Sequence, residues 1–152
     1  MFSCVPSKQT CSARGVSKCA EFIDKNYMFY LAFENSLCEE YVTEKFWDHL
    51  KGNLVPVVLG KANYHEIAPP HSYINAFDYN SPKELAIYLK YLMKNTTAYY
   101  EYFQWTDYFT VYQDQNRVFC QICEALNTEP PKHKVYEDAG YWWKNGQCQP
   151  KG

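Results

Sequence analysis

Hydrophobic and polar positions in the first half of the chain predict a strand, a helix and a second strand. The unbroken apolar run Tyr27–Phe33 is typical of a strand that is buried on both faces, as in a parallel sheet. Residues 41–51 follow it with apolar side chains four positions apart, which predicts an amphipathic helix. A second apolar run covers residues 54–59, although Pro56 removes one ladder hydrogen bond. The pattern predicts a βαβ unit with parallel strands.

The second half of the chain is predicted to be mainly helical after a short strand at residues 73–77. Ser81 is placed to cap a helix, with Pro82 at its first position and Glu84 completing a capping box. A core-facing stripe follows at helical spacing: Leu85, Tyr88, Leu89 and Leu92. Further helices are expected at 97–103 and 116–126. We therefore expect an α/β fold.

Three segments are expected along the chain. Residues 1–20 contain Cys4, Cys11 and Cys19 without helical or strand periodicity, which indicates a loop segment held by disulfides. Residues 21–128 carry the α/β pattern, and residues 129–152 read as an irregular tail. A length of 152 residues fits about one domain.

Composition narrows the classes of partner and compartment. The 15 basic and 17 acidic residues give a net charge of −2, so no nucleic-acid partner is expected. We find neither a targeting sequence nor an apolar run of about 18 to 20 residues, the length of a membrane span. The seven cysteines favour an oxidising compartment with one thiol unpaired or paired outside the chain. Aromatic residues make up 18% of the chain, which suits either a stacking surface or ordinary core packing.

The loop from Glu34 to Lys45 is the first candidate for chemistry. In an open α/β sheet, ligands bind where a strand ends and the next helix begins. The positive end of a helix there suits a phosphate, and an anion between the helix start and Lys45 would explain a cation in the first turn. The alternative is that Lys45 pairs with Asp48. The loop contains no glycine, so no P-loop or dinucleotide fingerprint is present.

Two neighbouring residues are open to both ligand-binding and structural interpretations. Glu44 can accept hydrogen bonds from sugar hydroxyls or simply favour the helix start. Tyr30 can contact a ligand or belong to the core. The chain contains no Asp-x-Asp pair, so a carboxylate-held metal is not indicated.

Cys120 and Cys123 form a C-x-x-C pair with three interpretations: a redox motif, half of a zinc site or a local disulfide. The sequence lacks a second pair of ligands with zinc spacing. Positions i and i+3 of a helix bring the Cα atoms within disulfide range, so we expect these cysteines to be joined.

The stretch FYLAFENSLCEEYVTEKFWDHLKGNLVPVVLG, from Phe29 to Gly60, resembles the signature of the α-1,3-fucosyltransferases, glycosyltransferase family 10. The likeness continues through KANYHEIAPPHSYIN, SPKELAIYL, YFQW, FCQIC and the tail with Trp142, Trp143 and Cys148. It implies the GDP-fucose-binding, Rossmann-like half of a two-domain GT-B enzyme. It also implies a full-length protein with a single membrane span in the Golgi.

The resemblance assigns roles to residues of the loop. Tyr30, Glu34 and Asn35 resemble donor contacts, Glu44 resembles the acid that binds ribose or fucose hydroxyls, and Lys45 resembles the lysine on the diphosphate. Tyr41 and Thr43 belong to the same YVTEK box.

The family transfers fucose from GDP-fucose to GlcNAc of glycoprotein glycans with inversion. GDP-fucose is a substrate, so no cofactor is expected and a divalent metal is at most stimulatory. The general base is expected in an acceptor domain that this chain lacks, so the chain alone is predicted to be inactive or nearly so. The alternative is a non-catalytic GDP-sugar-binding or interaction module.

Asn95, Thr96 and Thr97 form an N-glycosylation sequon at the end of a predicted helix. A luminal domain is expected to carry a glycan there. The sequence leaves open the pairing of the remaining cysteines: Cys4, Cys11, Cys19, Cys38 and Cys148.

Overall fold

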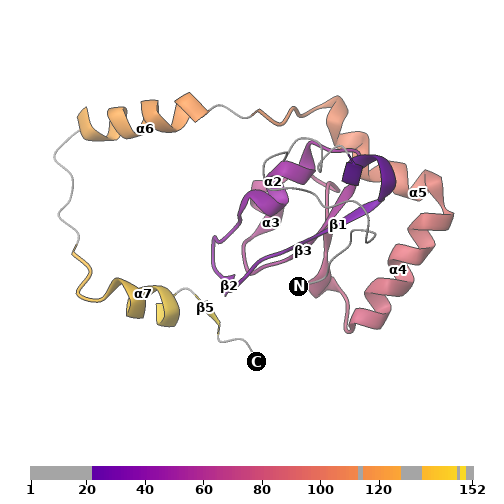
Figure 1. Cartoon of the computed structure of the whole chain (residues 1–152), viewed down its shortest axis with the longest axis horizontal. Coiled ribbons are helices and arrows are strands. Elements are labelled where there is room, and N and C mark those ends of the chain that lie inside the picture. Colours follow the sequence, from indigo (N-terminus) through magenta and orange to yellow (C-terminus); the bar gives the residue numbers. More distant parts are fainter. Residues whose placement is uncertain (1–21, 113–114, 128–134, 147, 150–152) are drawn as a thin grey trace.

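A three-stranded parallel sheet is the centre of the structure, a computed structural model that describes residues 22–112, 115–127, 135–146 and 148–149 (Figure 1). Its strands are β1 (Phe29–Phe33), β3 (Val55–Leu59) and β4 (Ile74–Asn75), in the order β1-β3-β4. All pairs are parallel, with Phe29 opposite Val55. The predicted strand-helix-strand unit is confirmed.

Helices cover both faces of this sheet, so the predicted α/β class is confirmed. On one face lie α2 (Glu44–Leu50) and α3 (Tyr64–Ile67), and their buried residues Phe46 and Tyr64 pack with Val58. On the other face lie α4 (Pro82–Lys94), α5 (Thr96–Tyr100) and the 3-10 helix η2 (Glu101–Asp107). The buried residues of α4 and α5, together with Tyr102 of η2, pack against Val55 and Val57. The other buried residue of η2, Trp105, packs instead in the cluster of Val58.

The central strand is β3, and burial on both faces applies to it rather than to β1. The side chains of Val55, Val57 and Val58 are essentially inaccessible, whereas Leu31 of β1 is 54% exposed. The expectation that Tyr27–Phe33 is buried on both faces is therefore wrong. An apolar run does not distinguish an edge strand from a central one, and β1 is an edge strand here.

The start of α4 follows the predicted capping signals with one shift. The Ser81 hydroxyl accepts a hydrogen bond from the Glu84 N–H at 3.2 Å. The Glu84 carboxylate accepts from the backbone N–H of Asn80 at 3.0 Å, one residue before the cap. A short 3-10 helix, η1 (Ala76–Asp78), joins β4 to this region. The Ser81 half of the predicted capping box is thus formed, whereas the Glu84 half reaches Asn80 in place of Ser81.

The sequon residue Asn95 lies between α4 and α5, and its side chain caps α5. Its Oδ1 accepts from the Ala98 N–H at 3.1 Å, and its Nδ2 donates to the Tyr91 hydroxyl at 2.8 Å. Substitution of Asn95 would therefore remove a helix cap together with the sequon, whereas exposed Thr97 provides a cleaner change.

We predict that Thr97→Ala, in protein secreted from eukaryotic cells, loses one N-linked glycan without destabilising α5, because the Asn95 cap is retained. The measurement is gel mobility before and after glycosidase treatment, with Thr96→Ala as the matched control that keeps the sequon. Identical mobility of wild type and Thr97→Ala would show that the site is unoccupied.

The carboxyl-terminal tail contains more structure than predicted. Helix α6 (Gln115–Asn127) matches the expected helix, but α7 (Ala139–Gly146) and β5 (Cys148–Gln149) lie in the segment predicted to be irregular. Strand β5 pairs antiparallel with β2 (Leu37–Cys38), and a disulfide joins Cys38 to Cys148. The tail is therefore attached beside the loop that follows β1.

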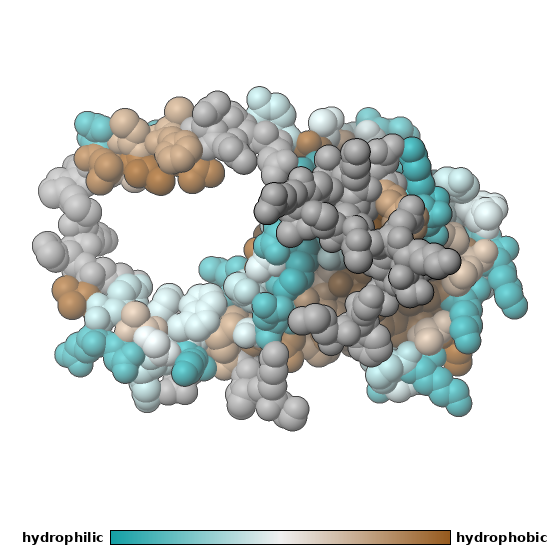
Figure 2. All heavy atoms as spheres, in the orientation of Figure 1, coloured by the Kyte–Doolittle hydropathy of each residue, from teal (hydrophilic) through white to brown (hydrophobic). Residues whose placement is uncertain are grey.

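The predicted Cys120–Cys123 disulfide is not formed, since both cysteines are exposed free thiols on α6. Side chains three residues apart on a helix have Cβ atoms about 5 to 6 Å apart, but a disulfide needs about 3.5 to 4.5 Å. The Cα atoms of such a pair lie within disulfide range, but the Cβ atoms do not. Helix α6 also exposes an apolar face, visible as the brown side of this helix in Figure 2, formed by Val118, Phe119, Ile122 and Leu126.

The predicted amino-terminal segment 1–20, with Cys4, Cys11 and Cys19, lies outside the described residues. Within the described ranges, no helix has the length and apolar character needed to cross a membrane.

Candidate functional site

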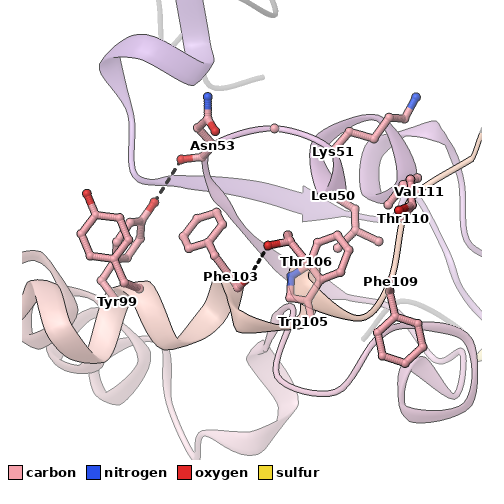
Figure 3. Close-up of a pocket in the computed structure, with 12 residues that line it drawn as sticks. Leu50, Lys51, Asn53, Tyr99, Phe103, Trp105, Thr106, Phe109, Thr110 and Val111 are labelled. Atoms are coloured by element: carbon pink, nitrogen blue, oxygen red, sulfur yellow. Dashed lines mark hydrogen bonds between the residues drawn. The ribbon is translucent and has the colours of Figure 1, made fainter.

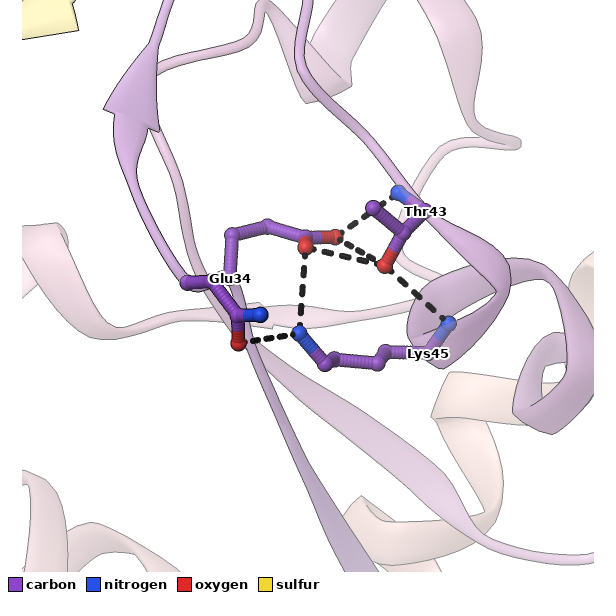
Figure 4. Close-up of polar contacts among 4 residues, drawn as sticks. Glu34, Thr43 and Lys45 are labelled. Carbon is purple, nitrogen blue, oxygen red and sulfur yellow. Dashed lines mark hydrogen bonds and ion pairs between the residues drawn. The ribbon is translucent and has the colours of Figure 1, made fainter.

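Glu34 immediately follows β1 and brings together the predicted site residues (Figure 4). Its backbone N–H donates to the Leu59 carbonyl at 3.0 Å, so the residue continues the pairing with β3. One carboxylate oxygen accepts from the Thr43 backbone N–H at 2.8 Å. The Thr43 hydroxyl lies 3.1 and 2.9 Å from the two carboxylate oxygens. Glu34 thus connects the end of β1 to the cap of α2.

Lys45 is held at the same place by two acceptors. Its ammonium donates to Asn35 Oδ1 at 2.8 Å and lies 3.5 Å from Glu34 Oε2. The Lys45 side chain is 24% exposed, and that of Glu34 is completely buried. An ammonium has three N–H donors, and these contacts use two of them. Among the described residues, the third has no partner and can bind an anion.

The expected phosphate cradle at the helix start needs a correction. The sequence predicts an anion between the start of α2 and Lys45, and the structure places the Glu34 carboxylate there. The Lys45 backbone N–H is directed to the Thr43 hydroxyl, and the Phe46 N–H donates to the Thr43 carbonyl. Because these backbone groups are engaged, the Lys45 side chain is the stronger candidate for contact with an anion. The alternative pairing of Lys45 with Asp48 is not observed in the described contacts.

Glu44 is the first residue of α2, and Tyr30 of β1 packs against the core cluster beneath this helix. Glu44 is exposed, so its carboxylate is available to a ligand. The Tyr30 ring stacks on His49 in the last turn of α2, with 3.5 Å between ring centroids. Burial, and then the nearby Glu44 and Asp48 carboxylates, raise the pKa of the Tyr30 hydroxyl. Tyr30 therefore lies near Glu44 and apart from the contacts between Glu34 and Lys45.

Tyr41 is half-buried and lies against the carboxyl-terminal tail. Its ring meets Trp143 of α7 edge to face, with centroids 6.0 Å apart. The backbone turns just before it, with the Tyr41 N–H donating to the Cys38 carbonyl and Glu40 at a φ of 56°. The YVTEK box is therefore supported from the tail as well as from β1.

Tyr64 and Gly60 form the floor of the site, which sequence reasoning missed. Tyr64 is 2% exposed, and its hydroxyl has no hydrogen-bond partner among the described residues. Burial and the nearby Glu34 carboxylate raise the pKa of Tyr64 to about 12. A Cβ on Gly60 would lie 2.6 Å from this hydroxyl and 3.4 Å from Glu34 Cγ. The signal available in the sequence was a glycine directly after a buried strand.

Lys61 provides a second cation near this edge and was also missed. Its ammonium lies 2.9 Å from Glu39 Oε1, and both side chains are partly exposed. Lys61 is the second residue after the end of β3, as Asn35 is the second residue after the end of β1. Within the described ranges, no group of three histidine, cysteine, aspartate or glutamate side chains could hold a metal ion.

A large cleft lies at the other end of α2 (Figure 3). It has a volume of about 720 Å³, and its lining includes Leu50, Lys51, Tyr99, Phe103 and Trp105. The segment that precedes β3, at the amino edge of the sheet, contributes polar groups to the lining of this cleft. The site predicted from the loop and this large cleft are therefore different places on the domain.

Comparisons with known proteins identify the family. A family model described as "Glycosyltransferase family 10 (fucosyltransferase) C-term" matches residues 3–142. The chain is 42% identical to Alpha-(1,3)-fucosyltransferase C of Drosophila melanogaster, covering 87% of this chain and 31% of the relative. It is 40% identical to Alpha-(1,3)-fucosyltransferase fut-1 of Caenorhabditis elegans, covering 98% and 36% respectively.

The structural comparison agrees. A crystal structure of an α1,3-fucosyltransferase with GDP-fucose aligns with a TM-score of 0.55 and 27% identity, covering 76% of this chain and 36% of that one. The chain spans about a third of the length of these relatives. The fold is the Rossmann-like half of a GT-B glycosyltransferase. The chain belongs to glycosyltransferase family 10, the fucosyltransferases, and matches the family's carboxyl-terminal domain.

Proposed function

We propose that this domain binds GDP-fucose and forms the donor half of a Golgi α-1,3-fucosyltransferase. In an enzyme of this kind, fucose passes to GlcNAc of a glycoprotein glycan with inversion. The support is family membership and the structural likeness to an α1,3-fucosyltransferase solved with GDP-fucose. The observation that carries the proposal is the exposed N–H of the Lys45 ammonium at the carboxyl edge of β1.

Lys45 binds the diphosphate in this proposal. Its ammonium is oriented by Asn35, and the N–H without a partner among the described residues donates to the diphosphate. Exposed Glu44 accepts hydrogen bonds from ribose or fucose hydroxyls, and Tyr30 lies beside it. Tyr41, Thr43 and Asn35 complete the donor set. No resident cofactor is part of the proposal.

The reaction is an in-line displacement at the anomeric carbon of fucose. As the bond to GDP breaks, negative charge grows on the diphosphate, and the fixed charge of Lys45 stabilises it. A general base removes the acceptor hydroxyl proton. Glu34 is unsuited to that task because it is buried and engaged by Thr43 and Lys45. We therefore propose that the base belongs to the acceptor domain.

We predict that Lys45→Met weakens GDP binding by about 1.5 to 3 kcal/mol, or about 10- to 150-fold, because a charge-assisted hydrogen bond is lost. Titration calorimetry measures this. Lys51→Met is the matched control, since Lys51 ends the same helix but lines the large cleft. Equal affinity of wild type and Lys45→Met, or a loss in Lys51→Met instead, would reject the site.

A further inference from the structure

We propose that Glu34 is a positioning residue of the donor site, which fixes the loop before α2 and the direction of Lys45 without contacting the ligand. This rests on the proposed function, which makes Lys45 the diphosphate ligand. The family resemblance places Glu34 among the donor contacts. Its environment in the structure indicates a different role, because its side chain is completely buried.

The contacts of Glu34 satisfy its charge within the protein. A buried carboxylate is costly unless it is paired and hydrogen-bonded. Here the backbone N–H of Thr43 lies at 2.8 Å, the Thr43 hydroxyl at 2.9 Å and the Lys45 ammonium at 3.5 Å (Figure 4). The backbone N–H of Glu34 is itself bonded to Leu59 of β3. The carboxylate therefore holds Thr43, nine residues later in the chain, in a fixed position relative to the sheet.

The floor of the site encloses Glu34 from the sheet side. Gly60 lies so close that an added Cβ would contact Glu34 Cγ at 3.4 Å and the Tyr64 hydroxyl at 2.6 Å. Tyr64 in turn packs on Phe46, the first buried residue of α2, with ring centroids 5.4 Å apart. With Thr43 and Lys45 on its other side, Glu34 has no face left for a sugar hydroxyl.

Two glutamates can therefore be told apart by the same substitution. We assign Glu44 to a ribose hydroxyl of GDP for this test. Glu44→Gln is then expected to weaken GDP binding about tenfold, because a neutral amide accepts hydrogen bonds from hydroxyls less strongly than a carboxylate. Glu34→Gln keeps an amide oxygen for the Thr43 N–H. It loses the ion pair with Lys45, but it also removes a negative charge beside the diphosphate. These effects oppose each other, so GDP affinity should stay within about threefold of wild type.

Glu34→Ala removes the anchor altogether. The Thr43 N–H then loses its acceptor, and the loop no longer holds Lys45 in place. We expect GDP affinity to fall about tenfold or more, and the hydrogen exchange of the Thr43 amide to rise by a similar factor. In the Lys45→Met background, Glu34→Ala should lower GDP affinity by less than about a further twofold, because Glu34 acts through Lys45.

The test measures GDP affinity by calorimetry and Thr43 amide exchange by NMR on the 152-residue chain and these variants. We expect Glu34→Gln to keep the Thr43 amide exchange and, within about threefold, the GDP affinity of wild type. We expect Glu44→Gln to bind GDP less tightly. The proposal is overturned if Glu34→Gln loses as much affinity as Glu44→Gln, or if Thr43 exchange is unchanged in Glu34→Ala. Should Glu34→Ala fail to fold, the two glutamine variants decide. If wild type does not bind GDP, the proposed function fails, and Thr43 exchange alone decides whether Glu34 is the anchor.

Discussion

Fucose transfer by this chain alone is expected to be at least about 100-fold slower than transfer by a full-length relative. General base catalysis typically contributes about 10²- to 10⁴-fold, and orientation of the acceptor adds several kcal/mol to the lowering of the barrier. In the proposed mechanism both depend on an acceptor domain, and the chain spans about a third of its relatives. The donor side remains, so slow hydrolysis of GDP-fucose is compatible with this expectation.

The measurement uses radiolabelled GDP-fucose with a glycopeptide and a lactosamine acceptor. The Drosophila melanogaster relative, Alpha-(1,3)-fucosyltransferase C, is the positive control. Turnover comparable to that of the control would show that the general base lies within this chain. Absence of transfer combined with GDP binding supports a donor domain that needs its acceptor half.

Loss of the Cys38–Cys148 disulfide should produce the largest change in stability. The bond joins residues 110 positions apart. In the chain-entropy description, closing a loop of about 100 residues stabilises the folded state by about 4.7 kcal/mol. Cys148→Ser should therefore lower the free energy of unfolding by about 4 to 5 kcal/mol.

Chemical denaturation of the oxidised protein measures this change. Cys123→Ser is the control, since Cys123 is an exposed free thiol and its substitution should change stability by less than about 0.5 kcal/mol. The disulfide also attaches the tail whose Trp143 contacts Tyr41, so GDP binding should weaken in the same variant. A loss below about 1 kcal/mol in Cys148→Ser would contradict a stabilising role for this bond.

The local signals of the sequence predicted the fold well. The Ser81 cap, the apolar run of β3 and the helical spacing of apolar residues in α4 each involve residues a few positions apart. They can therefore be recognised in the sequence alone. The cysteine pairing depends instead on β2 and β5 meeting across most of the chain. The short strand β5 carries no periodicity that would reveal it.

The structure brings Glu34, Asn35, Thr43 and Lys45 together, as their common loop suggests, but the contacts among them were not predicted. Lys45 in the first turn of α2 led to the prediction of a bound phosphate, whereas the structure places a carboxylate of the protein beside it. The anion is Glu34, and its pairing with Thr43 follows from the return of the chain to the end of β1. Tyr64 was missed because its role depends on packing against Gly60, which no spacing rule describes.

The most direct test of the proposed donor site is a ¹H–¹⁵N NMR titration of the chain with GDP. It distinguishes the loop after β1 from the large cleft at the other end of α2, because both contain backbone amides that can be followed separately. We predict the largest shifts at Asn35 and at Thr43, Glu44 and Lys45. Shifts concentrated at Asn53, Tyr99 and Phe103, with the Thr43–Lys45 amides unchanged, would contradict the proposed site.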